Sequence, residues 1–291
     1  MQDFEAKTAL ITGGASGMGL AMAENFARAG MNIVLADVEE GALKAAAESI
    51  EALGTTVLAV PTDVADEAAM DRLGDLTREC FGIPDILCLN AGVAGGGGQT
   101  DLLSTSDWKW AIDVNLYGII HGLRVFLGDM RRRDSGEVVI TASVAGLTSF
   151  PGSIPYNATK HAAVTIAEGL FSELADAESK LRVHCLCPGI VATQIHRSGR
   201  NRPKELENPQ NEAARLSSER RAVIENALES LYKSAKQPDE VAELVLEAIV
   251  EERFWIQTDG YYRESIRARH RSIENDTDPP ARGSIMSVYD E

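Results

Sequence analysis

The chain has 291 residues, of which 44% are hydrophobic and 25% are charged, a composition typical of globular rather than disordered proteins. Its 28 basic and 44 acidic residues give a formal net charge of −16, and such a field repels phosphate backbones, which argues against nucleic acid as a partner. The sequence starts without a charged, apolar leader and holds no run of about 18 uncharged apolar residues, so we expect a cytoplasmic protein with no membrane partner.

Short β-rich runs alternate with longer helical patterns along the chain, which predicts an α/β fold with a parallel sheet covered on both faces. No repeat or linker interrupts the alternation, so residues 1–291 are expected to form a single domain. Cys185 and Cys187 alternate within an apolar run and are interpreted as buried free thiols, and no metal site is predicted. We expect strands at 8–12, 32–36, 56–60, 86–89, 137–141, 182–186 and 254–257, and helices at 17–29, 39–53, 66–81, 105–130 and 155–174.

The first strand runs into a glycine-rich turn and then a helix, in the sequence TALITGGASGMG. Gly13, Gly17 and Gly19 permit a tight turn and let backbone amides approach a pyrophosphate at a helix N-terminus. The turn alone is weak evidence, but its place in a strand–turn–helix–strand unit makes the prediction of a dinucleotide site more specific.

The next strands also end in polar residues. Asp37 closes the second strand at the spacing expected of a carboxylate that binds ribose hydroxyls, and it is followed by VEE with no cation, so NAD is predicted over NADP. A turn or helix-capping aspartate is the alternative. Asp63 closes the third strand, where it could meet the adenine amine, and Asn90 closes the fourth. Polar residues at strand carboxyl ends are expected to line one crevice.

Two tyrosines precede a lysine by four positions, in YNATK and in YKSAK. Tyr156 of YNATK follows a strand that has Ser143 at its carboxyl end, whereas Tyr232 of YKSAK continues a helix and is interpreted as part of a surface helix with a chance pairing. Lys160, one turn after Tyr156, would favour the phenolate and lower the tyrosine pKa. Tyr156 is therefore the candidate general acid/base for an alcohol, with Ser143 holding the substrate oxygen.

Two segments break the alternation. Residues 189–216 are polar and lie between a strand and later helices, as a substrate lid or binding loop does. Residues 259–291 form a C-terminal extension, for which a frayed terminus and docking on a neighbouring subunit both stay open.

These features together resemble the short-chain dehydrogenase/reductase family over roughly residues 4–258. Each motif alone is unspecific, whereas the ordered set is highly specific. The resemblance implies a Rossmann-like, doubly wound parallel sheet of seven strands with helices on both faces, a nicotinamide cofactor, and a homodimer or homotetramer. The extension departs from the family's usual ending. The ordered set consists of TGGASGMG, Asp37, the Asp-Val pair at 63–64, NAG at 90–92, Asn115 in DVNLYG, Ser143, YNATK and PGIVAT.

The resemblance also implies roles by position. Tyr156 would be the general acid/base, Lys160 would bind the ribose and lower the tyrosine pKa, and Ser143 would orient the substrate carbonyl. Asn115 would keep a helix kink and a proton-relay water. The implied cofactor-binding set, with Val191 and Thr193 near the nicotinamide carboxamide, is Gly13, Ser16, Gly17, Met18, Gly19, Asp37, Asp63, Val64, Asn90, Ala91, Gly92, Tyr156, Lys160, Pro188, Gly189, Val191 and Thr193.

We therefore expect an NAD-dependent oxidoreductase that interconverts a secondary alcohol and its ketone, and the long 189–216 segment favours a bulky hydrophobic or aryl alcohol. A 3-oxoacyl-carrier-protein reductase is the near alternative, although NADP and a basic patch would suit it better. A catalytically idle NAD-binding sensor or scaffold is the alternative from another class. Such a protein could lose Ser143, Tyr156 or Lys160, and this chain has all three.

Overall fold

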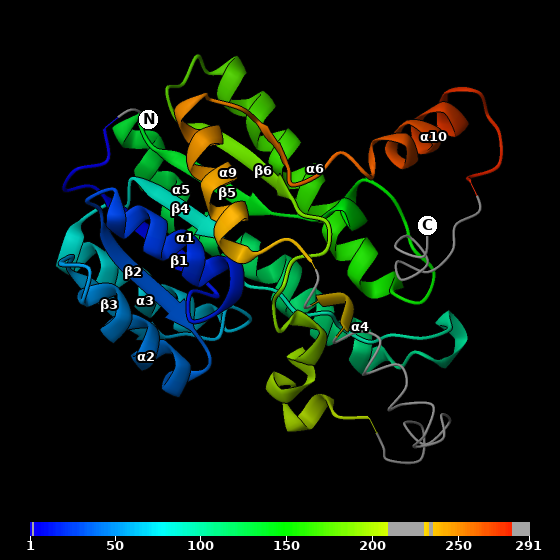
Figure 1. The fold of residues 1–291 in the computed structure, drawn as a ribbon, viewed down its shortest axis with the longest axis horizontal. Coiled ribbons are helices and arrows are strands. Elements are labelled where there is room, and N and C mark those ends of the chain that lie inside the picture. Colours follow the sequence, from blue (N-terminus) through cyan, green and yellow to red (C-terminus); the bar gives the residue numbers. More distant parts are fainter. Residues whose placement is uncertain (2, 209–229, 233–234, 281–291) are drawn as a thin grey trace.

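The computed structural model describes residues 1, 3–208, 230–232 and 235–280 (Figure 1). Seven strands form one parallel sheet in the order β3-β2-β1-β4-β5-β6-β7. Each end of each strand lies within one residue of its expected position, which confirms the Rossmann-like, doubly wound fold. The strands are β1 Thr8–Thr12, β2 Asn32–Asp37, β3 Val57–Pro61, β4 Ile86–Leu89, β5 Glu137–Thr141, β6 Arg182–Cys187 and β7 Trp255–Gln257.

Helices cover both faces of the sheet and create two apolar layers (Figure 1). Within β1, Ala9 and Ile11 belong to one layer and Leu10 to the other, because successive side chains of a strand point to opposite faces. Cys185 and Cys187 of β6 are buried free thiols, as predicted. One layer contains α1 Gly17–Arg28, α2 Glu40–Glu51 and α9 Pro238–Val250, and the other contains α3 Glu67–Phe81, α5 Gly118–Arg133 and α6 Ile154–Asp176.

The expected continuous α-helix at 105–130 is wrong. The helix α4 Thr105–Ile112 passes into a π-helical turn at Asp113–Tyr117, and α5 follows. Asn115 lies in this turn with no exposed surface. Its Oδ1 accepts the backbone N–H of Val93 at 2.8 Å and its Nδ2 donates to the Val93 carbonyl at 3.0 Å. The turn therefore aims a buried amide at the loop after β4, and it interrupts the α-helix where the resemblance implied a kink.

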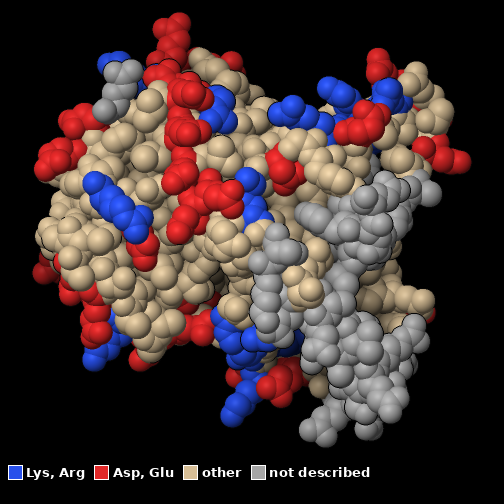
Figure 2. Space-filling model, in the orientation of Figure 1, with Lys and Arg blue, Asp and Glu red and all other residues tan. Residues whose placement is uncertain are grey.

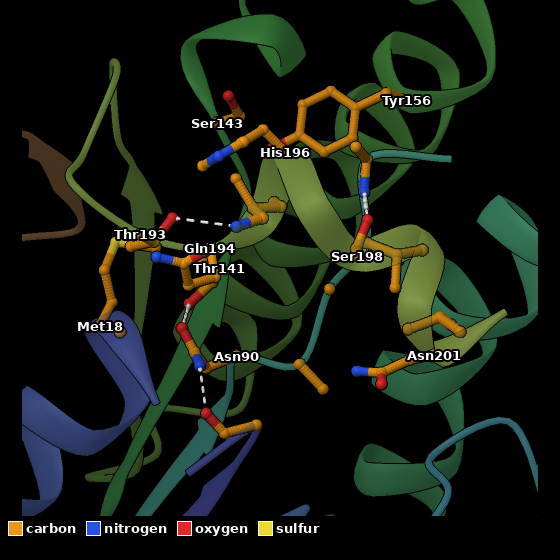
Figure 3. Close-up of a pocket in the computed structure, with 18 of the residues that line it drawn as sticks. Met18, Asn90, Thr141, Ser143, Tyr156, Thr193, Gln194, His196, Ser198 and Asn201 are labelled. Atoms are coloured by element: carbon orange, nitrogen blue, oxygen red, sulfur yellow. Dashed lines mark hydrogen bonds between the residues drawn. The ribbon is translucent and has the colours of Figure 1, made fainter. Parts of the chain in front are cut away.

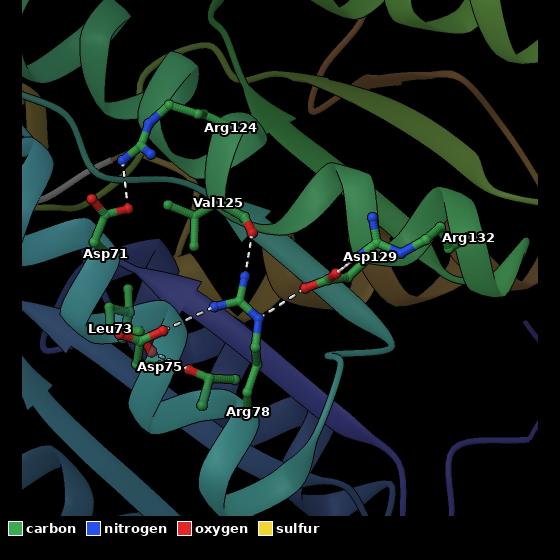
Figure 4. A network of polar contacts seen from close by, with 9 residues as sticks. Asp71, Leu73, Asp75, Arg78, Arg124, Val125, Asp129 and Arg132 are labelled. Carbon is green, nitrogen blue, oxygen red and sulfur yellow. Dashed lines mark hydrogen bonds and ion pairs between the residues drawn. The ribbon is translucent and has the colours of Figure 1, made fainter.

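Ion pairs connect α3 with α5 at the surface (Figure 4). Arg78 donates from Nε to Asp129 at 2.8 Å and from Nη2 to the Val125 carbonyl at 2.6 Å. Its guanidinium carbon also lies 6.0 Å from the centroid of the Phe126 ring. Because exposed pairs contribute at most about 1 kcal/mol each, the apolar layer beneath these helices stabilises their packing more than the charges do.

The C-terminal extension contains one helix in its described part, residues 259–280. Helix α10 Arg263–Glu274 projects from the body of the protein (Figure 1). Tyr262, which is 1% exposed, anchors its start, and its ring meets the Phe150 ring edge-on with 6.2 Å between centroids. A frayed terminus is therefore wrong for these residues, and 281–291 lie outside the described part. No described helix is long and apolar enough to span a bilayer.

Candidate active site

The carboxyl ends of β1 and β4 form the switch point of the sheet. After β1 the chain continues into α1 on one face of the sheet, and after β4 it continues to the opposite face. Thr12 Oγ1 accepts the backbone N–H groups of Asn90 at 2.9 Å and Ala91 at 3.2 Å. The Asn90 side chain donates to the Thr12 carbonyl at 3.1 Å and accepts from Thr141 Oγ1 at 3.2 Å (Figure 3). Asn90 thus joins the ends of three strands, and its amide is used to hold the crevice in shape.

Glycine positions of the turn after β1 have no room for a side chain. Gly13 has a φ of 64°, and a Cβ there would lie 2.9 Å from the Ala91 Cα. A Cβ on Gly19 would lie 2.0 Å from the Gly13 carbonyl oxygen. The turn therefore offers bare backbone to the pocket just before the N-terminus of α1, which fits a pyrophosphate.

The Asp37 carboxylate has a fixed position on the pocket wall. Its Oδ2 accepts the N–H of Ala15 in the glycine-rich turn at 3.1 Å, and its Oδ1 accepts the N–H of Glu39 at 3.0 Å. Asp37 therefore stabilises its own turn, as the alternative interpretation held, and also lines the pocket. A carboxylate fixed in this way suits ribose hydroxyls and repels a 2′-phosphate.

Three candidate catalytic side chains meet beside the end of β5. Lys160 is 2% exposed, and its Nζ donates to the Thr141 carbonyl at 2.8 Å and lies 5.6 Å from the centroid of the Tyr156 ring. Ser143 Oγ donates to the Pro188 carbonyl at 3.3 Å and accepts the Ala145 N–H at 3.1 Å. The sheet end and the start of α6 thus hold a hydroxyl, a phenol and an amine at one place.

Burial dominates the ionisation of this group. It raises the pKa of Tyr156 above the usual value; the Tyr232 phenol acts in the same direction, and a hydrogen bond with Ser143 opposes both. Burial also lowers the pKa of Lys160 to about 8. In the absence of a cofactor the Tyr156 pKa is therefore raised, contrary to the direction expected from the Tyr-Lys spacing, because desolvation outweighs the hydrogen bond with Ser143.

One pocket of about 410 Å³ collects almost every predicted site residue. Gly19 and Asn115 are the two that do not line it; the first packs against Gly13 and the second holds the loop after β4. The same pocket takes in side chains that motif reasoning missed: Trp110, Phe150, His196, Arg200 and Tyr232.

Tyr232 of YKSAK is helical and its spacing to Lys236 is a chance one, as expected, but its expected place on the surface is wrong. This residue lines the pocket, and its ring stacks on the His196 ring with 4.5 Å between centroids and 28° between planes. Lys236 does not share a helical turn with it: the backbone of Lys236 forms a bridge with Val191, and its Nζ lies 3.5 Å from Glu240 Oε1. The Tyr-Lys spacing does not indicate that Tyr232 lines the pocket, because Lys236 is not part of the pocket lining.

The segment 189–208 passes along the pocket in two short 3₁₀ turns, Ile195–Asn201 and Lys204–Leu206. Arg202 docks it on α4: its Nη1 lies 2.6 Å from Asp107 Oδ1, and both side chains are largely buried. In Figure 3 the imidazole of His196 points toward the side of the pocket that holds Ser143 and Tyr156. The segment therefore supplies a wall beside the candidate catalytic group, and its role as a lid stays a prediction. Residues 209–216 lie outside the described part.

A switch-point crevice with a glycine-rich turn, a fixed carboxylate and a Ser-Tyr-Lys group has the form of a dinucleotide-dependent oxidoreductase. Comparisons with known proteins agree. The model of the short chain dehydrogenase family matches residues 7–204. The chain belongs to the short-chain dehydrogenase/reductase family, as its sequence motifs predicted.

The chain is also similar to individual members over nearly its full length. It is 32% identical to a CLA biosynthesis dehydrogenase/reductase of Lactiplantibacillus plantarum, over 96% of this chain and 97% of that protein. It is 28% identical to a C alpha-dehydrogenase of a Sphingobium species, over 96% and 89%. A short-chain dehydrogenase/reductase from Burkholderia phymatum, solved in complex with NAD, is 39% identical with a TM-score of 0.90, over 98% and 100%. The NAD in that structure agrees with the predicted cofactor.

Because Lys160 is buried, we expect it to lower the free energy of unfolding by an amount that depends on pH. Lys160→Met should raise the free energy of unfolding at pH 7 by about 1–3 kcal/mol, because the folded chain no longer desolvates an ammonium. Between pH about 8 and 10.5 the unfolded wild-type chain binds more protons than the folded one, so its stability rises with pH and the gap closes. Urea unfolding at pH 7 and pH 10 measures this. The exposed Lys109→Met is the control, and a gap that stays constant or widens with pH contradicts the prediction.

Proposed function

We propose that the chain is an NAD-dependent dehydrogenase that interconverts a secondary alcohol and its ketone, with Tyr156 as general acid/base. The observation that carries this proposal is the convergence of Ser143, Tyr156 and Lys160 on the pocket that the glycine-rich turn also borders. A dinucleotide site and a proton-transfer group in one crevice are the two parts that such a reaction needs.

The residues that would hold the dinucleotide extend along the crevice. The turn at Gly13 and Gly17 would face the pyrophosphate and Asp37 the ribose of the adenosine half, with Asp63 toward the adenine. Thr193 packs close to Gly17, where a Cβ on the glycine would lie 3.0 Å from Thr193 Cγ2, so the far wall closes onto the turn. Bound NAD would supply a hydride acceptor and the positive charge of its nicotinamide ring.

Proton transfer is assigned to the protein side chains. Tyr156 takes the proton of the substrate hydroxyl in the oxidative direction, and Ser143 holds the substrate oxygen by a hydrogen bond. Burial raises the pKa of Tyr156, so the phenolate depends on positive charge around it. Lys160 Nζ, fixed by the Thr141 carbonyl, is the protein group placed to supply that charge and to bind a ribose hydroxyl.

The wall beside Tyr156 supports a bulky hydrophobic or aryl alcohol as substrate. Trp110, Phe150 and Tyr232 are aromatic, and Ile195 and Leu206 add aliphatic surface to the same pocket. Similar proteins carry names with large substrates, among them a 1-deoxy-11-beta-hydroxypentalenate dehydrogenase of Streptomyces exfoliatus, which supports a large substrate here.

A 3-oxoacyl-carrier-protein reductase is less well supported. An acidic carrier needs a basic surface, whereas acidic side chains run along α9 (Figure 2). The exposed residues Asp239, Glu243 and Glu247 recur there every four positions, on one face of the helix. A pocket that keeps Ser143 and Tyr156 together likewise gives no support to an idle sensor.

We also propose that the chain forms homo-oligomers through the edge of its sheet. Among the described strands β7 pairs with β6 alone, so one of its edges is open. Phe171 and Trp255 are 51% and 38% exposed, and Phe254 lies between them with centroid distances of 5.1 Å and 4.8 Å. An apolar cluster along an open sheet edge suits pairing with the same surface of a second copy.

Tyr156→Phe should lower kcat for secondary-alcohol oxidation by at least about 100-fold, because it removes the proton acceptor, while NADH still binds. Steady-state assays over a panel of aliphatic, aryl and steroid alcohols, combined with NADH fluorescence titration, measure both effects. Tyr232→Phe is the matched control and should keep kcat within about ten-fold. Unchanged turnover in Tyr156→Phe contradicts the mechanism, and a comparable collapse in Tyr232→Phe transfers the role to Tyr232.

Asp37→Ala should narrow the preference for NAD over NADP by at least about ten-fold, because it removes a carboxylate that binds ribose hydroxyls and repels a 2′-phosphate. The ratio of kcat/KM for the two cofactors, with one alcohol, measures the change. A ratio equal to that of the wild type would leave Asp37 with its turn-stabilising role only.

Trp255→Glu should shift the chain toward smaller assemblies in sedimentation velocity, because a carboxylate would be desolvated in an apolar interface. Ile273→Glu, an equally radical change on the 62% exposed Ile273 of α10, is the control. A wild-type monomer overturns the proposal, and a shift with Ile273→Glu alone places the interface on α10.

A further inference from the structure

Arg200 places a cation at the proposed ribose end of the pocket, where it contacts Glu39, a residue 161 positions earlier in the sequence. It lies in the 3₁₀ turn Ile195–Asn201 and reaches Glu39, two residues beyond Asp37. Its Nη2 and Nε donate to Glu39 Oε1 at 2.6 Å and 3.1 Å, and Asn201 Nδ2 donates to the same oxygen at 2.8 Å. All four side chains line one pocket.

The guanidinium of Arg200 is held from two sides. Its Nη1 donates to the carbonyls of Gln194 at 3.3 Å and Arg197 at 3.0 Å, within its own segment. The remaining donors, on Nε and Nη2, form the fork that matches a carboxylate or a phosphate, and Glu39 occupies that fork. Loss of Glu39 would therefore leave the fork available while the backbone carbonyls still hold Arg200 in place.

The Arg200–Glu39 pair is more important for what it places on the pocket wall than for its contribution to folding stability. Arg200 is 39% and Glu39 32% exposed, and ion pairs so open to solvent add little to folding stability. The hydrogen bonds from Arg200 and Asn201 hold the pKa of Glu39 below its usual value, so Glu39 is ionised at neutral pH. Glu39 also donates its backbone N–H to Asp37 Oδ1, which places the two carboxylates on one stretch of the wall.

We propose that Glu39 is a specificity-determining residue of the dinucleotide site, because it occupies the Arg200 fork that would otherwise receive the 2′-phosphate of NADP. The inference rests on the proposed NAD site and adds a second discriminator to Asp37. An arginine near the ribose is the usual means of accepting a 2′-phosphate. In this chain Arg200 is such an arginine, and the Glu39 carboxylate occupies the donors that would bind the phosphate.

The test is the affinity of the purified chain for NADH and NADPH, measured by fluorescence titration without substrate. Glu39→Ala should improve the ratio of NADPH to NADH affinity at least ten-fold over the wild type. The further change Arg200→Met in that background should reverse most of the gain. Glu40→Ala, which removes the neighbouring exposed carboxylate, is the matched control and should move the ratio less than three-fold. NADH affinity reports in each variant that the site is folded.

Each outcome either supports or overturns the proposed role of Glu39 in cofactor specificity. A ratio in Glu39→Ala no larger than in Glu40→Ala overturns the inference, and so does a gain that persists after Arg200→Met, because Arg200 would then not be the phosphate partner. If the wild-type chain binds neither dinucleotide, the proposed function fails as well. NADH binding with an unmoved ratio removes only the role of Glu39.

Discussion

The whole pocket depends on the hydrogen bonds between Thr12 and Asn90. β1 and β4 are neighbours in the sheet, but the chain leaves them toward opposite faces, so the backbone groups at their ends have no strand partner. Thr12 Oγ1 accepts two of these N–H groups, and the Asn90 amide joins the Thr12 carbonyl to the Thr141 hydroxyl. With the strand ends fixed, the glycine-rich turn and the Ser143–Tyr156 group face the same space.

The surroundings of the candidate catalytic group disfavour the charged forms of Tyr156 and Lys160. A phenol shielded from water resists losing a proton and a buried amine resists keeping one, and both effects appear in the pKa shifts of the partly buried Tyr156 and the buried Lys160. A surface pair at the same spacing would be easier to ionise but would be screened by water. The buried arrangement makes each added charge in the pocket more effective, at the expense of folding stability.

Local patterns in the sequence predicted the strands to within one residue because parallel strands buried on both faces read as apolar runs. Most of the residues that the ordered motifs predicted also line the pocket. The residue pattern missed the π-helical turn because apolar spacing on either side of Asn115 looks like one helix; only the resemblance implied an irregularity there. Arg200, His196 and Tyr232 were missed for another reason. His196 and Arg200 lie in a polar segment without a motif, and Tyr232 was interpreted as part of a surface helix. Only the folded chain places them in the pocket that Asp37 and Tyr156 also line. No spacing rule connects such distant positions.

The π-helical turn between α4 and α5 has a consequence for how the chain tolerates insertions and deletions. One extra residue in that turn sets the rotation of the helix that follows, since each helical residue rotates the chain by about 100° around the helix axis. Loss of a single residue within Asp113–Tyr117 would restore a regular helix and rotate Phe126 away from the sheet. Substitutions in this stretch are constrained only where side chains are buried, but its length is fixed. Relatives that differ here by one residue would therefore have to repack an entire face of the domain.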